Sequence, residues 1–158
     1  MKKMKLFLIT LTLLVAAKIT AWGCVCVGPD NPKEAKKWAQ LVFSGEILAF
    51  EKEGDQGLFT FRVDRVWKGV AEKQIVLSDP MYGSDCSRGL KVGAHYIIFA
   101  SYKRYDTPTP NPEGIYLSVD KNGKPRPAID TCSWSTNLAS IKQSKRVLKK
   151  IGKGRLIN

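Results

Sequence analysis

Hydrophobic and polar side chains alternate along the segment from Leu58 to Trp67. The positions expected to face a core are Phe59, Phe61, Val63 and Trp67, with Arg65 as the one polar exception. A period of two residues is typical of a β-strand with one buried face. The Lys68-Gly69 pair that follows predicts the end of this strand.

Strand-forming side chains are also concentrated elsewhere in the chain. The predicted strands are Leu41–Phe50, Gln74–Leu77, Ala94–Tyr102 and Ile115–Val119, and Pro125–Asp130 is expected to run extended. Turn and loop residues separate them at Gly54–Gly57, Asp79–Gly89, Thr107–Gly114 and Lys121–Lys124.

A short helix is predicted near each end of this series of strands. Asn31 is an N-cap residue followed by Pro32, which predicts a first helix that ends near Gln40. A last helix is expected to end at Gly152. Its expected caps are Ser135, Thr136 or Asn137, and its expected apolar stripe is Leu138, Ile141, Leu148 and Ile151.

These elements predict a mainly β fold of five or six short strands. The sequence has no internal repeat and no strand–helix–strand alternation. A small antiparallel barrel of the OB type, with the two helices packed outside it, fits this pattern best. A β-sandwich is the alternative.

The first 23 residues have the pattern of a secretory signal peptide. Three lysines precede an apolar run from Leu6 to Ala17, and small residues precede the expected cleavage site after Gly23. The apolar run is shorter than the roughly 20 residues that span a membrane. We therefore expect an exported protein, secreted, extracellular or periplasmic, that begins at Cys24. A retained membrane anchor and lipoprotein processing at Cys24 are the alternatives, although Trp22 fits the lipoprotein pattern poorly.

Loss of this leader would change the charge of the protein. The full chain has a formal net charge of +12, which falls to about +8 without the four leader lysines. Lys142–Arg155 contains seven basic residues and no acid, so the body before it is nearly neutral. This distribution argues against a nucleic-acid-binding protein. The basic helix is expected to be solvated, with anionic lipid or an acidic protein surface as possible contacts.

The expected organisation is a leader (1–23), one domain (24–151) and a basic tail (152–158), in a monomer.

The four cysteines are Cys24, Cys26, Cys86 and Cys132. An even number in an exported chain predicts two disulfides. Cys24 and Cys26 are poor partners for each other because one intervening residue would strain the bridge. Two long-range pairings remain open, and a four-cysteine zinc site is a further alternative that the unequal spacing disfavours.

The motifs along the mature chain resemble the tissue inhibitors of metalloproteinases, specifically their N-terminal, netrin-like OB-fold domain. The matching segments are Cys24-Val25-Cys26, Pro29 and Pro32, Trp67-Lys68-Gly69, Cys86 with Gly89–Gly93 and Tyr96-Ile97-Ile98, and Thr131-Cys132 with Trp134. A Cys-x-Cys motif at the mature terminus, with two more cysteines at matching spacing, carries most of the resemblance.

The resemblance implies disulfides Cys24–Cys86 and Cys26–Cys132, and inhibition of a zinc metalloendopeptidase. The α-amino nitrogen and carbonyl oxygen of Cys24 would displace water from the protease zinc, and Val25 would enter the adjoining specificity pocket. The implied contact ridge consists of Cys24, Val25, Cys26, Val27, Ser84, Asp85, Cys86, Ser87 and Arg88.

The chain also departs from the family. It lacks the cysteines of the family's third disulfide in this domain, and we expect no counterpart of the separate C-terminal domain of animal members. The same barrel serves elsewhere as a binding module without inhibitory activity. An extracellular or lipid-anchored binding module is therefore the alternative function.

No set of residues predicts an enzyme, and no cofactor of the protein's own is expected. His95 is expected to be an ordinary strand residue, Asp120 and Asp130 turn residues, and Ser133 and Ser135 have no neighbouring histidine. The aromatic residues that could stack nucleic-acid bases are expected to serve packing instead. They are Tyr96, Phe99, Tyr102 and Tyr105.

Overall fold

The computed structural model describes residues 28–69, 72–80, 82–84, 86–103, 118–129 and 132–157. Two helices and seven strands lie within them. In chain order they are α2 (Pro32–Trp38), β1 (Leu41–Glu53), β2 (Gln56–Lys68), β3 (Gln74–Asp79), β4 (His95–Ser101), β5 (Ala128–Ile129), β6 (Thr136–Asn137), α3 (Ile141–Ile151) and β7 (Arg155–Leu156).

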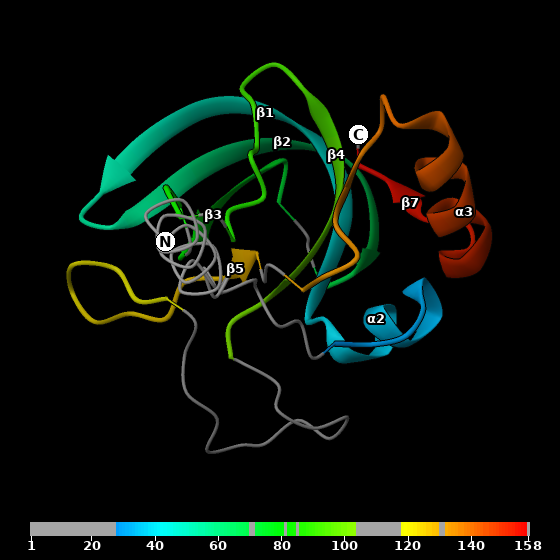
Figure 1. The fold of residues 1–158 in the computed structure, drawn as a ribbon, viewed down its shortest axis with the longest axis horizontal. Helices are drawn as coiled ribbons and strands as arrows, with labels where there is room; N and C mark the ends of the chain where they lie inside the picture. Colours follow the sequence, from blue (N-terminus) through cyan, green and yellow to red (C-terminus); the bar gives the residue numbers. More distant parts are fainter. Residues whose placement is uncertain are drawn as a thin grey trace, which may run out of the picture.

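Five of these strands close into a barrel, which confirms the predicted mainly β fold with two short helices. The strand order is β1-β2-β3-β5-β4, and β4 pairs back onto β1. All of these pairings are antiparallel except the one between β3 and β5. The long β1–β2 hairpin curves around one side of the barrel, while α2 and α3 lie together on the other (Figure 1).

The barrel interior is apolar, and Phe43 and Phe61 meet edge to face at its centre with ring centroids 5.5 Å apart. The predicted alternation along β2 is confirmed from Phe59 to Val63, whereas Leu58, expected on the outer face, is buried. Beyond Val63 the prediction is wrong: Val66 is buried, whereas Trp67 is only partly buried. The pairing register shifts at Asp64, which is an extra residue in β2. A β-bulge reverses the faces of the residues that follow it, which also explains the outward position of Arg65.

The expected Asn31 cap is confirmed, since its side-chain oxygen accepts hydrogen bonds from the backbone N–H groups of Lys33 and Glu34. The helix it begins, α2, packs with α3 outside the barrel, against side chains of β1 and β4. This second apolar cluster consists of Ala35, Ala39, Val42, Ile97, Phe99, Val147 and Ile151.

The predicted caps of the last helix are wrong, and its predicted apolar stripe is confirmed only at Ile151. Residues 136–137 form β6 and pair with β4, so α3 begins only after Ser140. Its buried side chains are Ser144, Val147 and Ile151. Ile141 is 65% exposed and Leu148 is 37% exposed. The late start places a different face of the helix against the barrel.

The Trp67-Lys68-Gly69 segment holds β2 to both helices. The Trp67 indole donates a hydrogen bond to the carbonyl of Gly152 at 2.7 Å, just beyond α3. The Lys68 ammonium donates to the carbonyls of Lys36 and Lys37 at the end of α2. Burial, followed by the charge of Lys36, lowers the pKa of Lys68. This motif therefore acts as a structural clamp.

Residues 152–157, expected to belong to a basic tail, return to the barrel. β7 pairs with β2 at Arg65 and Val66. The N–H of Ile157 also donates to the carbonyl of Asp64 at 3.1 Å. This strand covers the stretch of β2 beside the bulge.

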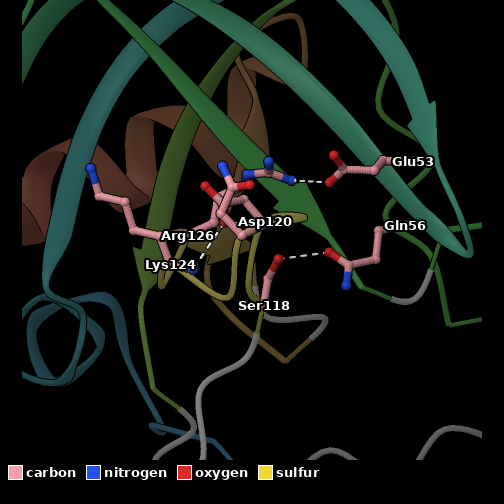
Figure 2. A network of polar contacts seen from close by, with 7 residues as sticks. Glu53, Gln56, Ser118, Asp120, Lys124 and Arg126 are labelled. Atoms are coloured by element: carbon pink, nitrogen blue, oxygen red, sulfur yellow. Dashed lines mark hydrogen bonds and ion pairs between the residues drawn. The ribbon is translucent and has the colours of Figure 1, made fainter.

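The segment from Ser118 to Arg126 is tied to the far end of the β1–β2 hairpin (Figure 2). Ser118 donates to the side chain of Gln56 at 2.6 Å, and the Arg126 guanidinium pairs with Glu53. Asp120 accepts backbone hydrogen bonds from Lys124 and Asn122, and these bonds lower its pKa. Asp120 is thus the turn residue that the sequence predicts, whereas Asp130 lies outside the described residues.

Candidate functional site

The candidate site centres on Cys132, beside which the first described residues of the chain lie. A Cβ added to Gly28 would be 3.0 Å from the carbonyl oxygen of Cys132 and 3.5 Å from its Cβ. The Trp134 indole also donates a hydrogen bond to the carbonyl of Pro29 at 2.8 Å. The start of the domain therefore runs along the 132–135 segment.

Arg88 binds the loop that carries Cys86 to the same segment. Its guanidinium donates to the carbonyl oxygens of Ser133 and Ser135, the latter at 3.1 Å. It also contacts the hydroxyl of Ser133 at 3.3 Å. Because a guanidinium offers several donors in a fixed plane, this one side chain fixes the Cys86 loop against the 132–135 segment.

The loop itself is compact. The N–H of Ser87 donates to the carbonyl of Ser84, and the N–H of Cys86 donates to the Ser84 hydroxyl. The Ser87 hydroxyl in turn donates to the buried carboxylate of Asp79 at 2.9 Å. These bonds fasten the loop to the end of β3.

The 132–135 segment is fixed to the barrel by serine hydroxyls. The buried hydroxyl of Ser135 accepts a hydrogen bond from the N–H of Phe99 in β4 at 2.9 Å. Ser133 and Ser135 bond to each other through their hydroxyls at 2.8 Å. These two hydrogen bonds hold the segment against β4.

Of the predicted contact ridge, the structure describes Ser84, Cys86, Ser87 and Arg88, while Cys24, Val25, Cys26, Val27 and Asp85 lie outside the described residues. The four described residues share one loop, which Arg88 holds against the Cys132 segment. Neither Cys86 nor Cys132 is a free thiol. The structure thus brings together the Cys86 loop, the Cys132 segment and the chain at Gly28.

Two sets of contacts in this arrangement, those of Asp79 and of Trp134, are not predicted from the sequence. Asp79 was expected only to begin a loop, yet it is 1% exposed and anchors Ser87. Trp134 joins Pro29 to the Cys132 segment, and the Arg146 guanidinium of α3 lies over its ring, 5.5 Å from the centroid. A lone tryptophan after a cysteine gives no signal for either contact.

Three of the remaining candidates, His95, Tyr96 and Phe99, lie in β4. His95 lies at the start of β4 with its Nε2 3.6 Å from the Asp64 carboxylate, and it is a strand residue as expected. Tyr96 and Phe99 are buried, which confirms that they serve packing; Tyr105 lies outside the described residues. The described part of the chain contains no group of three or more potential metal ligands, and no helix there has the length and apolarity needed to cross a membrane.

No protein-family model and no curated protein matches the chain.

Substitution Arg88→Gln is expected to lower the free energy of unfolding by about 2–3 kcal/mol, because partly buried carbonyls lose charged hydrogen-bond donors. Urea unfolding measures this change. The matched control is Arg62→Gln, which removes an exposed pair with Glu46 and should cost less than about 1 kcal/mol. Equal losses in the two variants would show that Arg88 does not hold the loop.

Proposed function

We propose that this chain is an exported inhibitor of zinc metalloendopeptidases, similar to the tissue inhibitors of metalloproteinases. Its inhibitory group is the α-amine and carbonyl of Cys24, exposed once the leader is removed. The observation that carries the proposal is the convergence at Cys132: Gly28 lies against this residue, and Arg88 brings the Cys86 loop to the same place. A chain terminus four residues before Gly28 would therefore lie near Cys132 and the Cys86 loop.

The same contacts favour one of the two disulfide pairings. Cys26 precedes Gly28 by two residues, which span at most about 7 Å of extended chain. Paired cysteines have Cα atoms about 4.4–6.8 Å apart, so a Cys26–Cys132 bridge suits the approach of Gly28 to Cys132. Cys24 and Cys86 then form the second bridge, which ties the terminus to the loop.

The barrel supports the proposal at the level of the fold. Its strand order, with β5 inserted between β3 and β4, is compatible with the OB type. We assign it to that type and to the netrin-like group within it. The barrel serves here as a rigid support for the terminus and the loop.

The proposed mechanism is metal chelation without catalysis. A protease zinc with three protein ligands holds water at its open position. The nitrogen and oxygen of Cys24 would replace that water in a five-membered chelate ring, once the terminal ammonium group has released its proton to solvent. Val25 enters the neighbouring specificity pocket. Two disulfides and the Arg88 hydrogen bonds fix this geometry before binding, so little conformational entropy is lost in the complex.

The test is a titration of the folded protein beginning at Cys24 against a panel of zinc metalloendopeptidases. We expect tight, slowly reversible inhibition of at least one of them, and no inhibition of a serine endopeptidase. Reduced and alkylated protein is the control, since it keeps the amine but loses its fixed position. Absence of inhibition across the panel, with a verified free terminus, would overturn the proposal and leave a binding module.

A further inference from the structure

The exposed side of α3 combines apolar and basic side chains in a way that the barrel does not require. Ile141 is 65% exposed and Leu148 is 37% exposed, although both have large aliphatic side chains. They are seven residues apart, so they lie on the same side of the helix. Val147 and Ile151 already fill the contact with the barrel.

Three lysines flank this apolar pair on the side away from the buried face of the helix. Lys145 lies between Ile141 and Leu148 on the same side of the helix, since it is four residues after one and three before the other. Lys142 and Lys149 adjoin them, and all three lysines are exposed. We call the five residues Ile141, Lys142, Lys145, Leu148 and Lys149 the α3 edge.

No acidic residue offsets this charge locally. The stretch from Lys142 to Arg155 contains seven basic residues and no acid, and all seven are exposed. An anionic surface is therefore the complementary partner. A soluble polyanion would satisfy the lysines alone, whereas a lipid surface also accepts the two aliphatic side chains below its headgroups.

We propose that the α3 edge docks the protein on anionic lipid bilayers. Ile141 and Leu148 enter the boundary between headgroups and acyl chains. The lysine ammonium groups stay among the lipid phosphates while their methylene stems follow the apolar side chains inward. This inference goes beyond the proposed inhibition and does not depend on it.

The docked orientation leaves the candidate site free. At 100° per residue, Arg146 lies about 140° around the helix from Ile141 and about 160° from Leu148. Arg146 is the α3 residue that covers Trp134 beside Pro29. The α3 edge and the start of the domain therefore face different directions.

The test measures binding of folded, unacylated protein to vesicles by co-sedimentation. One set of vesicles contains phosphatidylcholine alone and the other adds phosphatidylglycerol at about a third of the lipid. We expect binding only to the anionic vesicles, weakening as salt rises. Substitution Ile141→Ser together with Leu148→Ser should weaken this binding at least tenfold, since about one buried aliphatic side chain suffices for that factor. Val76→Ser removes a comparably exposed aliphatic side chain from β3 and should leave binding unchanged.

Two results would overturn the inference. One is the absence of binding to anionic vesicles at low salt. The other is binding that Ile141→Ser with Leu148→Ser leaves unchanged while Lys145→Gln with Lys149→Gln abolishes it. That result would show that charge alone attracts the protein to the vesicles, which favours a soluble polyanion as the partner. If the Leu148 substitution lowers stability, vesicle binding is measured with Ile141→Ser alone, because Ile141 is the more exposed of the two side chains. It should by itself weaken vesicle binding several-fold.

Discussion

A single alanine added before Cys24 is expected to raise the inhibition constant at least about 1,000-fold. The added residue converts the terminal amine into an amide nitrogen, which is a poor zinc ligand, and it fills the space that the metal needs. Loss of a chelate of this kind corresponds to about 4 kcal/mol of binding free energy. Inhibition titrations of the extended and unextended proteins against the same zinc endopeptidase measure the effect.

The matched control carries the same alanine after Asn158 and should inhibit normally. The thermal unfolding midpoint should agree among all three proteins, because the alanine before Cys24 lies outside the barrel core. Undiminished inhibition by the N-terminally extended protein would rule out zinc chelation by Cys24, even if inhibition itself persisted.

Substitution Gly69→Ala is expected to lower the free energy of unfolding by about 3–4 kcal/mol. Gly69 has φ +73°, and a Cβ there would overlap the carbonyl oxygen of Gln40 and lie 2.9 Å from Cδ2 of Leu41. An unfavourable backbone conformation costs about 1–2 kcal/mol, and the clash with backbone adds to it because neither partner can move cheaply. Urea unfolding provides the measurement.

Gly123→Ala separates the two causes. Gly123 has φ +76°, but a Cβ there would meet nothing within 4 Å. Gly123→Ala should therefore lower the free energy of unfolding only by the cost of the backbone conformation, about 1–2 kcal/mol. Equal losses at Gly69 and Gly123 would show that the close approach of Gly69 to Gln40 does not matter, and that the clamp is looser than its hydrogen bonds indicate.

The sequence predicts the individual elements of this fold better than their assembly. The Asn31 cap and the alternation from Phe59 to Val63 are local signals, and both are confirmed. The bulge at Asp64 depends on the register with β1, so no pattern in β2 alone announces it. The start of α3 was missed for a similar reason, because pairing of 136–137 with β4 overrides their capping preference.

The candidate site was predictable only where a resemblance pointed to it. The Cys86 loop was named from the family pattern, whereas Arg88 reaches the Cys132 segment across 45 positions of sequence. Asp79 was missed because a carboxylate after a strand usually marks an exposed turn. Contacts of this range follow from the closed barrel, which sequence spacing does not encode.

The proposed inhibition depends most on one chemical state, a free α-amine on Cys24 in a protein with both disulfides formed. An intact mass of the exported protein, taken before and after reduction, tests it most directly. We predict a chain that begins at unmodified Cys24 and gains about 4 Da on reduction, two hydrogens for each of two disulfides. A mass increased by acyl chains, or a chain that begins before Cys24, would contradict zinc chelation by this terminus.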